Sequence, residues 1–268
     1  MKLAKTSISV MGILNTTPDS FYDGGKFDAV ESAVARAKEM IAEGADIIDI
    51  GGESTGPESL DVSVEEEAGR VIPIIERIKN EELRIKNGIS VDTYKAEVAR
   101  QALEAGAFMI NDITAGRGDD EMFNVIADAG CEYVMMRGKD NSPRTTVKDE
   151  KYDDVIKTIH DFFEERIESA KKAGIQLEQI IIDPGLGHFV SSDPKYSWEV
   201  LERLEELKDL GCRILVSPSR KSFTADPPNQ PPSERLEGTL KATKIAIENG
   251  ADVVRTHDVG ETISLIQK

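Results

Sequence analysis

The sequence predicts an α/β fold, a (β/α)₈ TIM barrel in one domain that spans residues 1–268. Short apolar runs rich in β-branched residues recur eight times along the chain. Apolar residues at helical spacing lie between these runs, and no linker or low-complexity segment divides the chain. Eight strands and their helices fit a barrel of roughly 250 residues. A doubly wound open sheet is the alternative, but the strand count favours the barrel.

The predicted strands are buried on both faces. Their apolar residues are nearly continuous rather than alternating, as in Ile47-Ile48 and Ile180-Ile181-Ile182. This pattern is typical of parallel sheets covered by helices on each side. In chain order, the strands are expected at Ile8–Asn15, Asp46–Gly52, Gly88–Tyr94, Met109–Ile113, Tyr133–Arg137, Gln179–Gly185, Arg213–Ser219 and Val253–Asp258.

The predicted helices come from apolar residues that share one face. From Val30 to Ile41 such residues recur at three- and four-residue intervals, and Gly44 follows where a helix C-cap is expected. A second stripe runs from Ala68 to Ile78, and Pro73 should kink that helix or mark a boundary near it. Further stripes begin near Tyr152, Trp198 and Leu236, and the proline-containing stretch Ala225–Pro232 is expected to form a mobile surface loop.

The charge balance of the chain excludes several kinds of partner. Acidic residues outnumber basic ones 50 to 33, which gives a formal net charge of −17. Most of this surface would repel a phosphate backbone or an anionic membrane, so we expect neither nucleic acid nor membrane as a partner. An anionic ligand would require a local cluster of basic side chains.

The sequence also predicts the cellular compartment of the protein and the redox state of its two cysteines. No stretch approaches the ~18 apolar residues of a membrane span, and Met1 to Val10 lacks the apolar core of a signal peptide. Cys131 and Cys212 have no metal-type spacing, which favours two reduced, buried thiols. We therefore expect a cytoplasmic protein.

Polar residues stand at the ends of the predicted strands, where a parallel barrel collects its chemistry. Asp92, Asn111 and Asp183 lie within or directly beside apolar runs. A buried carboxylate needs partners, so these side chains should converge on one pocket. Two carboxylates and an amide make a receptor for a flat heterocycle that carries N–H donors.

Basic residues form a second cluster at the last two strands: Arg220, Lys221, Arg255 and His257. Their convergence in so acidic a chain predicts an anion site, on the usual phosphate side of such barrels. Asn15 on the neighbouring first strand could add a neutral oxygen ligand for Mg²⁺. The segment Ser219–Phe223 should run into a helix N-terminus, whose free amides favour a carboxylate.

The remaining histidines, and several absent motifs, narrow the chemistry. His160 lies on a predicted helix and is expected to be structural, whereas His188 follows the sixth strand and should lie near the pocket. The chain contains no Ser-His-Asp order, Walker loop, dinucleotide fingerprint or Cys/His metal cluster. Hydrolysis by a nucleophilic serine, nucleotide-driven motion and hydride transfer therefore lack support.

Seven motifs in order resemble the dihydropteroate synthase family, over almost the whole chain. They are Met11–Gly25, Gly44–Thr55, Ser90–Tyr94, Asn111–Ile113, Asp183–Gly185, Ser219–Phe223 and Arg255–Asp258. The resemblance implies a transferase of folate biosynthesis on a (β/α)₈ barrel. It would condense 6-hydroxymethyl-7,8-dihydropterin diphosphate with 4-aminobenzoate, giving 7,8-dihydropteroate and pyrophosphate, and would commonly be a homodimer.

The resemblance also implies a role for each matched residue. Catalysis would depend on Asp92, Asp183, Lys221 and Arg255. The pterin would contact Asp92, Asn111, Ile113, Met136, Asp183 and Lys221; the diphosphate would contact Asn15, Thr55, Arg255 and His257, with Mg²⁺ held partly by Asn15. The aminobenzoate would contact Phe21, Asp23, Pro57, His188, Ser219 and Ser222, and the first two loops, 21–23 and 55–57, would close over the site.

Several positions depart from the family pattern, mostly on the aminobenzoate side. Gly56 stands where the family usually has an arginine, and Arg137 replaces a customary histidine. The family's Phe-Gly-Lys run is His188-Phe189-Val190 here, Pro218 precedes Ser219, and Ala225 stands near a usual glycine. The strings 216–221 and 255–257 also resemble the divergent, sulfonamide-insensitive branch of the family. Sensitivity to sulfonamides, which compete with aminobenzoate, is therefore an open question.

Two other functions could use the same pterin contacts. One is a methyltransferase domain of the pterin-binding superfamily, which would move a methyl group from methyltetrahydrofolate. It would not need the basic cluster of Arg220, Lys221, Arg255 and His257. The other is a non-catalytic pterin-binding module, which would leave Asn15 without a task.

Overall fold

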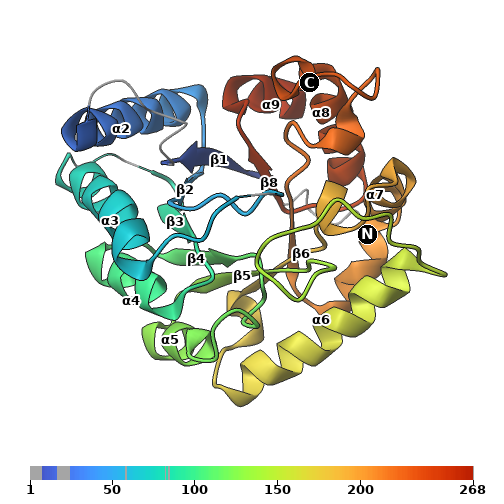
Figure 1. Ribbon diagram of the computed structural model, residues 1–268, viewed down its shortest axis with the longest axis horizontal. Helices are drawn as coiled ribbons and strands as arrows, with labels where there is room; N and C mark the ends of the chain where they lie inside the picture. Colours follow the sequence, from blue (N-terminus) through green and yellow to red (C-terminus); the bar gives the residue numbers. More distant parts are fainter. Residues whose placement is uncertain (1–7, 17–24, 58, 82, 84, 268) are drawn as a thin grey trace.

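Eight parallel strands form a closed barrel in chain order, β1 to β8 (Figure 1). The computed structural model describes residues 8–16, 25–57, 59–81, 83 and 85–267. Closure between β1 and β8 confirms the predicted barrel and excludes the open sheet. The strands are β1 (Ser9–Asn15), β2 (Ile47–Gly51), β3 (Ile89–Asp92), β4 (Met109–Asp112), β5 (Glu132–Met136), β6 (Ile180–Asp183), β7 (Arg213–Val216) and β8 (Val253–Thr256).

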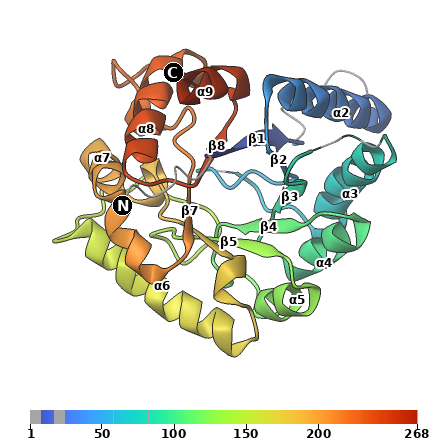
Figure 2. The ribbon, with the colours of Figure 1, turned by 180° about the vertical axis from the view of Figure 1, so that it is seen from behind.

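Helices surround the barrel, as Figures 1 and 2 show from opposite sides. They are α2 (Gly25–Glu43), α3 (Val64–Asn80), α4 (Ala96–Ala105), α5 (Met122–Ala129), α6 (Val155–Lys172), α7 (Pro194–Glu202), α8 (Leu236–Glu248) and α9 (Val259–Ile266). Shorter 3₁₀ turns are η1 (Leu177–Gln179), η2 (Gly187–Phe189), η3 (Leu204–Leu210), η4 (Ser222–Thr224) and η5 (Pro232–Glu234). Gly44 follows α2 with φ +106°, a conformation that favours glycine, which confirms the expected end of that helix.

An apolar layer inside the barrel positions the site. It consists of Met11, Ile47, Met109, Val134, Ile181, Leu215 and Val253, all nearly inaccessible. Residues two apart on a strand share a face. The next inward residues, two positions further along β2, β4, β5, β6 and β8, are therefore Asp49, Asn111, Met136, Asp183 and Arg255. All but Met136 are polar, and we call them the polar layer, which lies directly above the apolar one.

Two local predictions differ from the structure. Helix α3 continues through Pro73, so no boundary lies there, while the other expectation, a kink, stays a prediction. Pro73 is on the exposed face, while Val71, Ile74, Ile75 and Ile78 are buried on the other, and this packing outweighs one missing hydrogen bond. The helix expected from Ser219–Phe223 is only the three-residue turn η4, so the predicted helix N-terminus there is wrong.

Other features agree with expectation. Cys131 and Cys212 are free and buried, and burial raises the pKa of each thiol to about 11. Residues 226–229 and 231–234 are exposed, as predicted for the proline-containing loop. Within the described part of the chain, no helix offers a stretch long and apolar enough to cross a bilayer.

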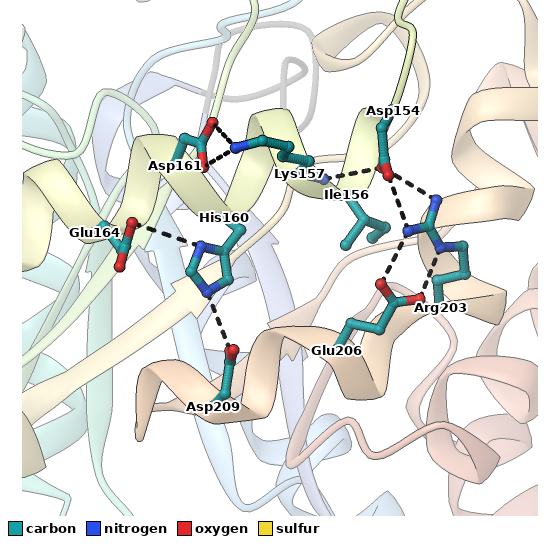
Figure 3. A pocket seen from close by; sticks show the side chains of 9 residues that line it. All are labelled: Asp154, Ile156, Lys157, His160, Asp161, Glu164, Arg203, Glu206 and Asp209. Atoms are coloured by element: carbon teal, nitrogen blue, oxygen red, sulfur yellow. Dashed lines mark hydrogen bonds and ion pairs between the residues drawn. The ribbon is translucent and has the colours of Figure 1, made fainter.

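His160 lies on the outer surface, in a hollow between α6 and η3 (Figure 3). Its Nδ1 is 3.8 Å from a carboxylate oxygen of Glu164, and its Nε2 is 3.2 Å from one of Asp209. The neighbouring Lys157 and Asp161 pair with each other at 2.7 Å. The charged groups of this hollow thus satisfy one another, which agrees with the structural role expected for His160.

Candidate active site

Arg255 is the centre of the polar layer above the apolar layer. Its Nε lies 2.6 Å from Asp49 Oδ2, and its Nη2 lies 2.7 Å from Asp92 Oδ2. Asn111 Nδ2 donates to the same Asp49 oxygen at 3.0 Å. One arginine from β8 therefore joins strands β2 and β3, and β4 is added through the Asn111 amide.

Asp92 and Asp183 are carboxylates in a water-poor setting. Burial raises the pKa of Asp92 to about 7, although the nearby Arg255 opposes this rise. Burial also raises the pKa of Asp183, against the attraction of Lys221. Asp183 Oδ1 accepts one hydrogen bond from the Gly185 amide at 2.8 Å. A ligand that brings N–H donors to these oxygens would stabilise their charged forms.

Lys221 approaches this layer from the loop after β7. Burial lowers the pKa of its ammonium to about 8, and the charge of Asp183 limits the fall. The ammonium nitrogen is 5.1 Å from the centre of the Phe189 ring, an arrangement that favours the cation. Phe189 belongs to the run that departs from the family pattern, so this departure retains an aromatic contact to the lysine.

His257 is neutral at neutral pH. Burial lowers its pKa to about 4, and the positive charge of Arg255 adds to the effect. Ser219 Oγ accepts from the His257 backbone amide at 3.0 Å and lies 2.9 Å from His257 Nδ1. Ser219 therefore fixes the orientation of the His257 ring through both its backbone amide and Nδ1.

The four basic residues of the predicted cluster differ in charge and in partners. Arg220 forms a two-point pair with Asp258, at 2.5 and 3.1 Å, so its charge is largely neutralised there. His257 is uncharged, for the reason above. Lys221 and Arg255 are the members of the cluster that face the buried carboxylates.

The other predicted pterin contacts lie at the ends of neighbouring strands. Met136 ends β5 and Ile113 follows β4, and both are buried. Apolar groups beside a carboxylate layer suit the faces of a flat ring, whose edge carries the polar atoms.

Residues predicted for the diphosphate and aminobenzoate come from the loops. Asn15 ends β1 with an exposed side chain, and Thr55 follows β2. Ser222 Oγ is 3.3 Å from His188 Nε2, so the seventh and sixth loops meet. Pro57 is exposed on the second loop. Phe21 and Asp23 lie outside the described residues.

Asp49 is a site residue that the sequence reasoning missed. It is fully buried in β2 and binds both Arg255 and Asn111. Its Oδ1 has no hydrogen-bond partner among the described residues. The available signal was a charged residue inside the apolar run 47–50, two positions after the inward-facing Ile47.

The arrangement can bind a flat, donor-rich ring and a neighbouring anion at once. The Asp92 and Asp183 carboxylates offer acceptors, while Lys221 and Arg255 offer donors beside the His257 ring. Such a layer can stabilise charge that separates during group transfer, because its dipoles are fixed before reaction.

Comparison with known proteins identifies relatives along the whole chain. A family described as pterin binding enzymes matches residues 11–257. The dihydropteroate synthase of Synechocystis sp. is 46% identical over 251 residues, which are 93% of this chain and 85% of that protein. A Clostridium difficile dihydropteroate synthase structure, determined in the presence of pteroic acid, has a TM-score of 0.89 and 43% identity and covers 100% of this chain and 97% of its own. A Xanthomonas albilineans dihydropteroate synthase structure with 4-aminobenzoic acid has a TM-score of 0.89 and 39% identity, over 99% of this chain and 93% of that one.

Proposed function

We infer the function from the premise that this chain belongs to the pterin-binding enzyme family. It is a transferase with the activity of a dihydropteroate synthase in folate biosynthesis. It condenses 6-hydroxymethyl-7,8-dihydropterin diphosphate with 4-aminobenzoate, and the products are 7,8-dihydropteroate and pyrophosphate. We treat residues 1–268 as one pterin-binding domain.

The buried acceptor layer of Asp92, Asn111 and Asp183 is the observation that carries the assignment of the pterin. Asp92 and Asp183 end β3 and β6, and Asn111 is the last residue but one of β4, all above the apolar layer where water has little access. We assign them to the N–H edge of the ring, because paired carboxylate–donor bonds are strong and directional. We assign Ile113 and Met136 to its apolar faces and Lys221 to a polar edge.

In the reaction, the bond between the pterin methylene carbon and the diphosphate oxygen breaks, and that oxygen keeps the electron pair. The aminobenzoate nitrogen forms the new bond to carbon and releases a proton. We propose that cleavage runs ahead of attack. Asp92 and Asp183 would then offset positive charge on the pterin, while Arg255 and the His257 imidazole would stabilise the departing anion.

We propose that Mg²⁺ accompanies the diphosphate. Asn15 fits this ion, because an exposed amide oxygen at the rim of the barrel is the neutral ligand that Mg²⁺ accepts beside phosphate oxygens and waters. Bound there, the ion would supply positive charge to the leaving group. Asn15 would hold it, and Thr55 would contact the phosphate nearby.

We assign the aminobenzoate to the loops: Pro57 on the second, His188 on the sixth, and Ser219 and Ser222 on the seventh. Ser222 and His188 already meet, which supports a common wall. Phe21 and Asp23 belong to the first loop, outside the described residues. Whether sulfonamides inhibit depends on this wall. A Yersinia pestis dihydropteroate synthase structure with a sulfonamide drug complex, 36% identical to this chain, is the natural comparison for inhibition assays.

We propose a cytoplasmic homodimer, by resemblance to the family. Two buried free thiols suit a reducing compartment. The net charge of −17 supports small-molecule substrates rather than nucleic acid or membranes as partners. Light scattering of the purified chain tests the dimer directly.

A coupled assay of pyrophosphate release tests the proposed activity. We expect release only when the pterin diphosphate, 4-aminobenzoate and Mg²⁺ are all present, with 7,8-dihydropteroate formed in equal amount. Pterin binding without release would indicate a binding module. Methyl transfer from methyltetrahydrofolate, with no pyrophosphate, would indicate the related methyltransferase activity.

A further inference from the structure

The loop after β5 connects two of the loops assigned to aminobenzoate, the second and the sixth. We call residues 138–146 the strap, and residues 53–57 with 59–61 the second loop. The amide of Thr145 donates to the Thr55 carbonyl at 3.4 Å, and the amide of Lys139 donates to the Phe189 carbonyl at 2.8 Å. The strap therefore bonds to the second loop at one end and to the sixth loop at the other.

The strap is itself rigidly anchored. The ammonium of Lys139 is almost fully buried and donates to Asp140 at 2.6 Å, to the Thr146 carbonyl at 2.7 Å and to the His188 carbonyl at 2.8 Å. Asp140 also accepts from the Thr146 amide at 2.9 Å. These bonds close the strap on itself and fix it to the loop that carries His188.

Arg144 lies in the strap, and its side chain binds the second loop at several points. Its Nε donates to the Ser59 carbonyl at 2.9 Å, and its Nη2 donates to the Leu60 carbonyl at 2.6 Å. Its Nη1 pairs with Asp61 at 2.5 Å, and Nη2 also pairs with the buried Glu53. The planar guanidinium carries five N–H donors in a fixed fork, which suits it to hold several acceptors of one loop together.

The pair between Arg144 and Glu53 differs from a surface ion pair because the Glu53 side chain is buried. Its side chain is 3% exposed and also accepts from Lys95 and from the Tyr94 hydroxyl. Burial alone would raise the pKa of Glu53, but Lys95, Arg144 and Tyr94 outweigh it, so the pKa is lowered. The carboxylate therefore stays charged, and it links Arg144 to the end of β3.

The second loop has no arginine of its own at the family's usual position. Gly56 stands there, and a β-carbon at Gly56 would meet only Ser54 Oγ, at 3.7 Å. Space for a side chain thus exists, yet the guanidinium that binds this loop comes from another loop.

We propose that Arg144 is a positioning residue for 4-aminobenzoate, which acts by holding the second loop from the strap. The inference rests on the proposed function, because the second loop is assigned to aminobenzoate only there. Arg144 touches neither the acceptor layer nor Lys221 among the contacts described, so its effect should be confined to one substrate.

Steady-state kinetics of Arg144→Ala and Arg144→Lys test this role. We expect KM for aminobenzoate to rise about tenfold in Arg144→Ala, while KM for the pterin diphosphate and kcat change less than about twofold. Arg144→Lys should be intermediate, since one ammonium replaces part of the fork. Arg100→Ala, at an exposed pair with Glu97 on α4, is the matched control. Equal changes in both KM values, or none, would overturn the proposal.

Hydrogen exchange separates this inference from the assigned activity. In Arg144→Ala the amides of residues 59–61 should exchange faster than in the wild type, and Arg100→Ala should leave them unchanged. Unaltered exchange would contradict the positioning role, whatever the kinetics. If the wild type releases no pyrophosphate, the proposed function fails, while the exchange result still decides whether Arg144 holds the loop.

Discussion

Asp49 organises the site although it sits at its base. It accepts from Arg255 and from Asn111 and is fully buried, so its charge is what makes a buried guanidinium tolerable. Asn is nearly the same shape as Asp but carries no charge. Replacing the aspartate would therefore leave Arg255 less well compensated without opening a cavity.

Asp49→Asn should lower kcat/KM for the pterin diphosphate by about 10- to 100-fold, equivalent to roughly 1–3 kcal/mol for a charged hydrogen bond. The control is Asp46→Asn. Asp46 begins the same strand run at the opposite end of the barrel, where it binds the Val10 amide and Lys86. That variant should lose stability but keep its kinetics. Equal activity of Asp49→Asn and the wild type would remove Asp49 from the site.

Lys221 gives the site a dependence on pH. Burial lowers its pKa to about 8 in the free protein. A ligand that prefers the charged ammonium raises this pKa. The affinity of the protein for such a ligand is therefore highest below pH 8 and falls as the pH rises above 8. We expect pterin diphosphate affinity to drop by up to about tenfold per pH unit above 8 until the pKa of the complex is reached.

Lys221→Arg isolates the lysine, because a guanidinium stays charged throughout this range. Titration of the pterin ring itself is common to both proteins and cancels in the comparison. Calorimetry between pH 7 and about 9.5 should therefore give a steeper fall for the wild type than for Lys221→Arg. Parallel curves would mean that the charge of Lys221 does not contribute to binding.

Among the elements, α3 combines good and poor helix determinants. Ser63 caps its N-terminus by accepting from the Glu66 amide at 3.2 Å, and acidic residues fill the first turn. Gly69 and Pro73 disfavour the same helix. Gly69 is exposed, and a β-carbon there would meet no atom within 4 Å.

Gly69→Ala should therefore stabilise the protein by about 0.5–1 kcal/mol, since alanine restricts the unfolded chain without a clash. Urea denaturation measures this gain. Gly12→Ala is the contrasting variant, because a β-carbon at Gly12 would lie 2.7 Å from Met40 Sδ. It should destabilise the barrel. A loss of stability in Gly69→Ala would show that α3 needs the flexibility of glycine.

At the scale of elements, the sequence was sufficient for strand positions and order. Seven of the eight strands lie within their predicted runs, and β5 begins one residue before its run, at Glu132. Near-continuous apolar runs bounded by polar turns are a strong local signal. The extent of helices was less predictable. Pro73 is locally unfavourable in a helix, but four buried neighbours on α3 decide the outcome through packing.

Some features of the site could likewise be predicted from the sequence, and others could not. Asp92, Asn111 and Asp183 could be found because a polar residue stands out in an apolar run. The pairing of Arg220 with Asp258 and the neutral state of His257 could not, because both depend on which side chains meet in space. Asp49 had a signal, but its meaning required the register that sets it beside Arg255 and Asn111.

For the whole molecule, a net charge of −17 and an anionic substrate stand in apparent conflict. The barrel separates the basic side chains of the site from most of the acidic residues. The side chains of Lys221 and Arg255 lie within the layer that receives the ligand, where water is scarce and screening is weak. The acidic surplus lies largely in exposed helices and loops outside this layer, where solvent and salt reduce its effect.

The central claim is that the carboxylates at the strand ends form one receptor for the pterin ring. The most direct measurement is calorimetric titration of pterin diphosphate into the wild type and Asp183→Asn. The account predicts binding weaker by about 10- to 100-fold, because a ring donor loses a charged acceptor of unchanged shape. Equal affinity in the two proteins, with the fold intact, would contradict it.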